Sequence, residues 1–277
     1  MVRIVTDSTA DLLPGVAADL DITVVPCYVV FGTETYRDGV DLTKGQFYEK
    51  LAGASVIPTT AAPPPAVYEH VYEQLAQVTR NIVSIHLAGK LSAIHASAAS
   101  ATKSVSGVRI VALDSEQVTM GYGWMAIAAS EAARRGASLE QIVALIESMK
   151  SRSQVLAVLD TLDFVHRGGR VGWVRAMLGS LLKIKPIVKV HGGEVRLVDR
   201  GRTWNRSLDK LMERVQALGP LERAIVLHAN APDLAECVAD RLQTLDPKWD
   251  RLVGQAGVTI ASHAGPGAVG IACVTSG

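Results

Sequence analysis

Three cysteines are all that this 277-residue chain contains, and Cys27, Cys237 and Cys273 lie far apart without a Cys-x-x-Cys pair. We therefore expect neither a disulfide framework nor a cysteine-bound zinc ion, and we interpret the thiols as reduced, buried side chains. The seven histidines include no His-x-x-x-His pair, so no metal site is expected. The formal net charge of only +1 argues against broad electrostatic binding to nucleic acid or to an anionic membrane.

Long apolar runs are also missing. No run approaches the roughly 18 residues that a transmembrane helix requires, although hydrophobic residues make up 48% of the chain. The sequence starts with MVRIVTDSTA, which is a strand pattern instead of the basic and then apolar segment of a secretion signal. We therefore expect a cytoplasmic protein without a membrane segment, with enough residues to bury a large core.

Short β-branched runs alternate with helical patterns in the first part of the chain. The expected strands cover 2–6, 81–86, 108–113 and 155–160, and the expected helices cover 68–78, 91–103 and 119–135. Thr43 with Gln46, and Ser138 with Gln141, fit capping boxes and predict two further helix starts. Strands that alternate with helices favour an α/β fold with a parallel sheet.

The pattern changes after Asp160, where strand-like runs outnumber helical ones. The expected strands cover 184–190, 194–199, 223–229, 257–262 and 269–275, and the expected helices lie near 205–217 and 233–245. This half is therefore predicted to be a second α/β domain with a mixed sheet. We place the boundary near residue 160, which divides the chain into domains 1–160 and 161–277.

Two glycine-rich segments resemble nucleotide-binding motifs only superficially. GPGAVG (265–270) fits Gly-x-Gly-x-x-Gly, but a strand-like run follows it where a dinucleotide fingerprint needs a helix. AGKLSA (88–93) has Leu91 where a phosphate-binding loop needs Ser or Thr after the lysine. A serine hydrolase using Ser92, His263 and Asp7 is an alternative, but Ser92 does not lie in a Gly-x-Ser-x-Gly turn.

Several segments spread over the whole chain belong together as a signature. They are IVTDSTADL (4–12), YRDGVDLT (36–43), PTTAAPP (58–64), DTLDFVHRGGRVG (160–172), KIKPIVKVHGGEV (183–195), RTWNRSL (202–208) and SHAGPGAVG (262–270). In this combination the chain resembles the DegV family of bacterial fatty-acid-binding proteins, which includes the lipid-carrying subunits of fatty acid kinases. The resemblance implies an N-terminal three-layer α/β/α domain, a C-terminal two-layer α/β domain, and a long-chain fatty acid such as palmitate between them.

The resemblance also implies which side chains hold the ligand. Thr60 and Ser92 correspond to hydroxyls that bind the carboxyl group, and His263 corresponds to a histidine beside it. Each residue has a plainer interpretation. Thr60 fits the cap of a following helix and Ser92 fits a helix start, whereas His263 fits a hydrogen bond to its own glycine-rich turn.

Three further residues are possible supports of the pocket. Thr59 neighbours Thr60, while Asp7 and Ser8 follow the first strand, at the end where α/β proteins usually place their sites. Asp7 and Ser8 fit a local Asx turn with helix capping equally well. Around Ser92 the segment HLAGKLSAIHA departs from the family's more hydroxyl-rich pattern, which leaves the acyl length and the kinase link open.

Arg170 follows the pair Gly168–Gly169, whose freedom to adopt positive φ can turn the chain outward near the pocket mouth. In kinase-associated relatives, a separate ATP-binding protein phosphorylates the carboxylate, and a matching arginine serves partner contact and phosphoryl transfer. The resemblance gives this role to Arg170 and to Arg202, because arginine binds phosphate in a bidentate manner. The plain alternative is that Arg170 pairs with a carboxylate across the domain interface.

The chain is thus expected to be a substrate-binding subunit without a catalytic residue, a cofactor or a nucleotide site of its own. A stand-alone lipid carrier or sensor is the main alternative, and a hydrolase using Ser92 and His263 is the weaker one. Residues 122–129 and 173–184 are candidate tunnel-lining segments, although such apolar stripes are more often ordinary core.

Overall fold

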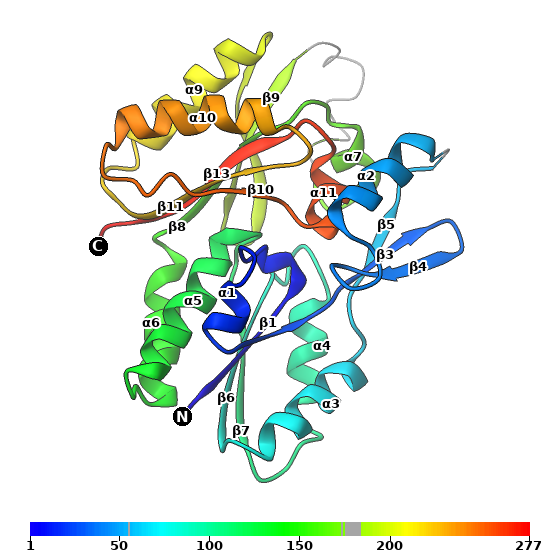
Figure 1. Ribbon diagram of the computed structural model, residues 1–277, viewed down its shortest axis with the longest axis vertical. Coiled ribbons are helices and arrows are strands. Elements are labelled where there is room, and N and C mark those ends of the chain that lie inside the picture. The colour runs from blue at the N-terminus through cyan, green and yellow to red at the C-terminus, as the bar shows by residue number, and fades with distance from the viewer. Residues whose placement is uncertain (55, 173, 175–183) are drawn as a thin grey trace.

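Two large β-sheets organise the protein, one of four strands and one of six (Figure 1). The computed structural model describes residues 1–54, 56–172, 174 and 184–277. An α/β fold with a parallel sheet in the first part of the chain and a mixed sheet in the second is confirmed. Both sheets have helices on their outer faces (Figure 1).

The N-terminal sheet has the strand order β2-β1-β6-β7, and all neighbouring strands are parallel. Its strands are β1 (Arg3–Asp7), β2 (Ile22–Val25), β6 (Asn81–His86) and β7 (Arg109–Asp114). Figure 1 shows helices on both sides of this sheet. They are α3 (Pro65–Ala76) and α4 (Ile94–Ala101) on one side, and α5 (Met120–Arg134) and α6 (Leu139–Lys150) on the other. The three-layer arrangement follows from apolar residues on both faces of these strands.

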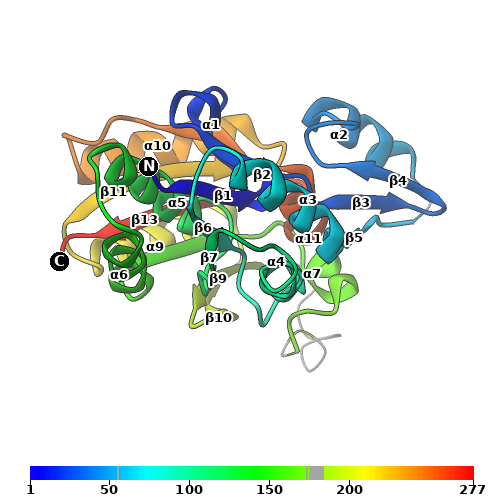
Figure 2. The ribbon, with the colours of Figure 1, turned by 90° about the horizontal axis from the view of Figure 1, so that it is seen from below.

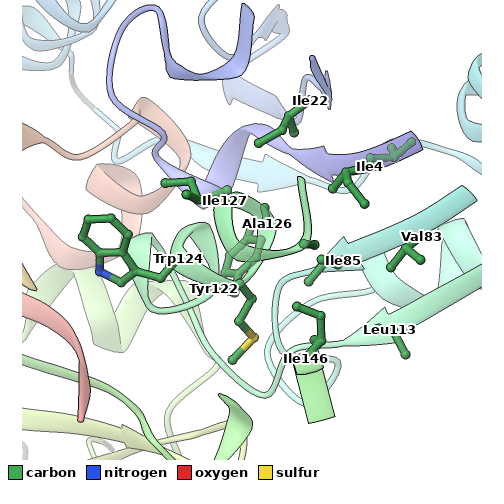
Figure 3. Close-up of a cluster of buried hydrophobic side chains, with 14 of the residues drawn as sticks. Ile4, Ile22, Val83, Ile85, Leu113, Tyr122, Trp124, Ala126, Ile127 and Ile146 are labelled. Carbon is green, nitrogen blue, oxygen red and sulfur yellow. The ribbon is translucent and has the colours of Figure 1, made fainter. Parts of the chain in front are cut away.

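Helix α5 lies between the two sheets and is buried over almost its whole length. Figure 3 shows α5 beside buried side chains of β1, β6 and β7 that belong to the same core, including Ile4, Ile85 and Leu113. On its other side, Trp124 donates a hydrogen bond from Nε1 to the carbonyl oxygen of Ala272, at 3.2 Å. Among the described residues, no helix has the length and apolar character needed to cross a membrane.

The six-stranded sheet has the order β10-β9-β8-β13-β11-β12, in which only β11 and β12 form a parallel pair. Its strands are β8 (Ser153–Val158), β9 (Lys185–His191), β10 (Glu194–Gly201), β11 (Leu221–His228), β12 (Val253–Gln255) and β13 (Val269–Thr275). Helices α9 (Trp204–Gln216) and α10 (Pro232–Leu245) pack on one face. The other face points toward the N-terminal half and carries the cavity described below.

Strand β8 lies on the C-terminal side of the seam between the sheets. It pairs antiparallel with β9 and β13, although residues 155–160 read as a strand of the N-terminal half. Antiparallel and parallel strands share the same local apolar pattern when both faces are buried, so the sequence does not distinguish the two sheets. The expected division into 1–160 and 161–277 stays a prediction, and the partners of β8 favour a boundary before Ser153.

A small third sheet projects to one side of the two large sheets, next to α2 (Lys44–Gly53) and α11 (Val258–Ala264) (Figure 2). It has the order β4-β3-β5, with β3 (Tyr28–Phe31), β4 (Glu34–Arg37) and β5 (Thr59–Ala61). Helix α2 connects β4 to β5, and Phe47 of this helix packs edge to face on Phe31 with ring centroids 5.8 Å apart. Both predicted capping boxes, at the starts of α2 and α6, are confirmed.

Residues 258–264 are helical, so the strand predicted over 257–262 is wrong. Helix α11 (Val258–Ala264) begins after Gly257, whose N–H donates to Asp11 Oδ1 at 2.7 Å. The N–H of Thr259 donates to Asp38 Oδ2 at 3.2 Å. Two carboxylates from the N-terminal half therefore satisfy free N–H groups at the start of this helix, and this outweighs the strand preference of its β-branched residues. The remaining short elements are η1 (Ser8–Ala10), α1 (Val16–Asp19) and α7 (Asp163–Gly168).

Candidate functional site

A cavity of about 280 Å³ lies on the inner face of the six-stranded sheet, close to the lower end of the roughly 300–1,000 Å³ typical of ligand pockets. Its walls come mainly from β8, β9, β13, α11 and the start of α4. Most of the wall is apolar, with Leu87, Leu91, Val155, Leu159, Val188, Val190 and Leu227 among the larger side chains. Such a wall suits a long hydrocarbon group.

Strand alternation explains how this wall is built. Val155, Ala157 and Leu159 line the cavity, whereas Leu156 and Val158 belong to the core under α9 and α10. Successive side chains of a strand point to opposite faces, so the continuous apolar run of β8 serves a packed core and a ligand-sized space at once. The apolar run of β8 therefore has two causes: one face packs in the core, and the other lines the cavity.

Two polar side chains of the lining, Thr60 and His263, are in direct contact. Thr60 Oγ1 lies 2.7 Å from His263 Nε2, so the strand β5 and the helix α11 meet through a hydrogen bond between residues 203 positions apart. Arg170 is exposed and lines the cavity beside them. Desolvation, with the nearby charge of Arg170, lowers the pKa of His263 to about 4. His263 is therefore neutral at physiological pH, and Arg170 carries the positive charge next to it.

The glycine pair before Arg170 has two distinct structural roles. A Cβ atom at Gly168 would lie 2.6 Å from His263 Nδ1, so only glycine lets the imidazole approach α7 this closely. Gly169 ends α7 with φ of 71°, a left-handed conformation that favours glycine. Arg170 then donates from Nη1 to the carbonyl oxygen of Gly168 at 2.7 Å. Among the described residues Arg170 has no carboxylate partner. The alternative that Arg170 pairs with a carboxylate across the domain interface is therefore not supported.

Ser92 lines the same cavity, from the turn that precedes α4. Its Oγ also accepts a long hydrogen bond from the N–H of Ile94, at 3.4 Å. The helix-start interpretation and the ligand interpretation are thus compatible, since one hydroxyl oxygen has a second lone pair and a donor hydrogen. Thr60 caps no helix: it lies in β5, and the first turn of α3 follows Pro64 without a side-chain cap.

Asp7 lies outside the described cavity lining and belongs to a buried hydrogen-bond network. Its Oδ2 lies 2.9 Å from His86 Nδ1, and its Oδ1 accepts from Thr9 N–H at 3.1 Å, as expected for an Asx turn. The triad of Ser92, His263 and Asp7 is therefore not assembled, because Asp7 is paired with a different histidine. This observation argues against the hydrolase alternative, because Asp7 is not available to orient His263.

The other predicted residues also lie outside the lining formed by the described residues. Ser8 donates to Asp38 Oδ2 at 3.1 Å and accepts from Cys27 N–H at 3.0 Å, so it ties the end of β1 to the segment before α2. Thr59 is exposed on β5, and Arg202 is exposed in the turn between β10 and α9. The structure thus brings Thr60, Ser92, His263 and Arg170 to one cavity and leaves these residues elsewhere.

Two expectations about the tunnel walls have different outcomes. Residues 122–129 contribute nothing to the described lining, and they form packed core between the sheets, so their prediction as lining residues is wrong. Of the segment 173–184, residues 173 and 175–183 lie outside the described residues. The sequence analysis missed Asp11 and Asp38, which fix α11 and thereby the position of His263; Asp11 does lie within the signature IVTDSTADL.

The chemistry of this site is hydrogen bonding and charge on the wall of an oily space. Within the described ranges, no three His, Cys, Asp or Glu side chains are grouped in a way that suits a metal ion. Thr60 and Ser92 offer hydroxyls, His263 a neutral ring and Arg170 a cation. Together they match a ligand with an acidic group at one end and an apolar remainder.

Comparisons with known proteins agree with this geometry. The sequence model of the family described as "Uncharacterised protein, DegV family" matches residues 1–276. A DegV domain-containing protein of Deinococcus radiodurans is 36% identical over 275 residues, which cover 98% of this chain and 97% of the relative.

Two solved structures match at the level of the whole fold. DegV of Bacillus subtilis, described as a fatty acid binding protein, superposes with a TM-score of 0.91 at 32% identity and covers 99% of both chains. A DegV family protein from Thermus thermophilus, described by its fatty acid binding, has a TM-score of 0.91 at 30% identity, again over 99% of both chains.

Proposed function

The chain belongs to the DegV family, and from this premise we propose that its cavity binds a long-chain fatty acid, such as palmitate, with the carboxyl group at Thr60, Ser92 and His263. One observation carries the proposal: a single cavity combines apolar walls with these hydrogen-bonding groups and Arg170 at its rim. The fatty acid binding described for the Bacillus subtilis and Thermus thermophilus proteins supports it.

The acyl tail supplies most of the affinity in this proposal. Each buried CH₂ group contributes about 0.8 kcal/mol, so a chain of roughly sixteen carbons gains on the order of 10 kcal/mol before ordering costs. The polar end then fixes the orientation of the ligand. A neutral His263 and two hydroxyls bind the carboxylate without a buried counter-charge, so its oxygens keep their negative charge and stay reactive.

We further propose that the protein presents this carboxylate to a separate ATP-dependent fatty acid kinase and is not itself the enzyme. Arg170 supports this role because it is exposed, lines the cavity and forms no ion pair within the described part of the chain. A free guanidinium at the cavity rim suits a phosphoryl group in transfer. Arg202 is proposed as a second contact of the kinase from the turn before α9.

Ligand extraction tests the binding proposal. Protein purified from a bacterial host under native conditions is expected to release about one equivalent of fatty acid on denaturing extraction, because a tail buried in this cavity dissociates slowly. Mass spectrometry identifies the acid, and circular dichroism of the same sample verifies the fold. A folded protein that neither retains lipid nor takes up added palmitate would contradict the proposal.

Replacing Arg170 with Ala separates kinase presentation from lipid carriage. We expect the variant to bind palmitate within about twofold of wild type, since a rim arginine contributes little to burial of the tail. Acyl phosphate formation with ATP and a DegV-associated kinase is expected to fall by two orders of magnitude or more, because positioned cations stabilise the transferring phosphoryl group. Arg135→Ala, at the exposed end of α5, is the matched control.

The outcome distinguishes the alternatives. A stand-alone lipid carrier or sensor is favoured if wild-type protein binds palmitate and no such kinase phosphorylates the bound acid. If palmitate binding itself falls in Arg170→Ala, the arginine belongs to the carboxylate site instead of the partner surface. Acyl phosphate formed by the wild-type protein and ATP without any partner would overturn the assignment as a binding subunit.

A further inference from the structure

Val155, near the start of β8, lines the cavity and packs directly on helix α5. We propose that Val155 is the stop of the cavity, meaning the side chain that closes its inner end and sets the longest acyl chain it accepts. Gly121 of α5 lies directly behind Val155 and holds it in place. This inference rests on the proposed fatty acid binding and adds a residue that selects among fatty acids by length. It follows from the register of the sheet and from one close contact.

The lining residues of the sheet form three rows across the strands. The first row includes Leu159 and Ala268, the middle row is built on Ala157, and the third row is built on Val155. Ala157 lies opposite Val188 and Gly270, and Val155 lies opposite Val190 and Ala272. Rows are two residues apart, or about 6.6 Å, so the first and third rows are separated by about 13 Å.

The polar end of the cavity adjoins the first row. Helix α7 begins four residues after Leu159, and its Gly168 is in contact with the imidazole of His263. Helix α11, which carries His263, ends shortly before β13 begins at Val269. A carboxyl group at Thr60 and His263 therefore directs its tail past the first and middle rows, toward Val155.

Behind the third row the protein is solid. A Cβ atom on Gly121 would lie 2.6 Å from Val155 Cγ2, so the valine methyl already occupies the space above the helix backbone. Trp124 fixes the helix to the same row through its hydrogen bond to Ala272. Tyr122 and Met125 fill the next layer of α5 and are fully buried. Because a packed interior of this kind resists displacement, Val155 cannot retreat from an advancing methyl end.

A matched pair of variants tests the stop. Val155→Ala removes two methyl groups from the end of the cavity, and Val158→Ala makes the same change on the opposite face of β8, in the core under α9 and α10. Each protein is stripped of lipid, incubated with an equimolar mixture of saturated acids from laurate to arachidate, and analysed by mass spectrometry. Circular dichroism verifies folding.

Val155→Ala is expected to shift the preferred acid by about two carbons toward longer chains and to raise the ratio of the longer to the shorter acid about tenfold, since one methylene discriminates by at least this factor. Val158→Ala is expected to keep the wild-type profile. Val155→Ile adds a methylene and shifts the profile toward shorter chains; it decides the question alone if Val155→Ala does not fold.

Two contrary results have different meanings. If wild-type protein takes up none of the acids, the proposed function fails and the stop fails with it. If the wild type binds fatty acid but both Val155 variants keep its length profile, fatty acid binding stands and the assignment of Val155 as the stop is overturned.

Discussion

Replacing Asp7 with Ala is expected to lower the free energy of unfolding by about 3–5 kcal/mol, because it removes the shared acceptor of a fully buried hydrogen-bond network. Asp7 and His86 are both completely buried, with Asp7 Oδ2 2.9 Å from His86 Nδ1. Asp7 Oδ1 also accepts from Thr9 Oγ1 at 2.5 Å and from the hydroxyl of Tyr122 at 2.8 Å. The variant leaves all of these groups without their acceptor in a site closed to water.

The electrostatics of this network support the size of the effect. Burial by itself raises the pKa of Asp7, but the hydrogen bond and charge of His86, together with the Thr9 and Tyr122 hydroxyls, lower it overall. The carboxylate is therefore held in its charged form inside the protein. Because the network continues from His86 Nε2 to Ser84 Oγ at 2.7 Å, its loss also disturbs β6.

Urea denaturation followed by circular dichroism measures the change. Asp41→Ala is the control, because Asp41 pairs with Arg37 on the exposed surface and its loss should change stability far less. Asp7→Asn keeps the volume and one acceptor oxygen, so it should lie between the two. If Asp7→Ala is as stable as Asp41→Ala but no longer retains fatty acid, Asp7 acts on the ligand and the structural interpretation is wrong.

Asp11 is expected to make the protein less stable as pH rises from about 4 to about 7. Desolvation raises the pKa of this buried carboxyl group from 3.8 to about 7. The folded protein therefore holds a proton here that the unfolded chain has released throughout this window. The resulting stabilisation is complete below pH 4 and is lost by about pH 7, and over three pH units it amounts to about 4 kcal/mol at most.

The groups around Asp11 explain why burial dominates. Thr119 Oγ1 donates to it at 2.5 Å and Gly257 N–H donates at 2.7 Å, which both favour the charged form. Lys44 lowers the pKa and Asp38 raises it, so their charges oppose each other. The pKa of Asp38 is itself raised by desolvation. The charge of Lys44 thus acts on two carboxyl groups at the start of α11 and does not offset the burial of either. Asp11 is the group whose pKa rises to about 7, so the folded protein keeps its proton in the acidic range.

Asp11→Asn tests this linkage. Asparagine tolerates the φ of 53° at this position, and its amide can accept from Gly257 and donate to Thr119. The difference in unfolding free energy between variant and wild type should therefore grow by several kcal/mol in favour of the variant between pH 4 and pH 8. Urea titrations at each pH provide the values.

The control is Asp41→Asn, which reports on an exposed carboxyl group. Hydrogen bonds from Arg37 lower the pKa of Asp41 to about 2, so its contribution is lost only as pH falls from about 4 through 2. This variant should keep the wild-type pH dependence above pH 4. A pH dependence in Asp11→Asn that matches the wild type would show that Asp11 is charged across the whole range.

The sequence predicts elements whose determinants are local. Thr43 and Ser138 both cap helices as expected, because a capping box needs only four consecutive residues. Helix α11 was missed because its start depends on Asp11 and Asp38, which lie 246 and 221 positions away from their partners Gly257 and Thr259. Propensity favours a strand there, and no local pattern records the distant carboxylates.

The same limit applies to the candidate site. Thr60 and His263 meet across 203 positions, and only the resemblance to a family placed them together beforehand. Residues 122–129 look like the wall of a tunnel and are core, because an apolar helix has the same composition in both settings. For Gly168 the sequence predicts a turn, because a glycine pair precedes Arg170. Its contact with the His263 ring joins segments far apart in the chain and follows only from the structure.

Helix α5 has a consequence for how the two halves depend on each other. Since it completes the core of the parallel sheet and also covers the inner face of the mixed sheet, neither half retains a closed interior when it is expressed alone. The two halves should lose structure in one cooperative step instead of two. If the cavity binds a fatty acid as proposed, the ligand has to enter and leave by a route that keeps this shared helix in place, and the exposed Arg170 places that route at the rim around α7 and α11.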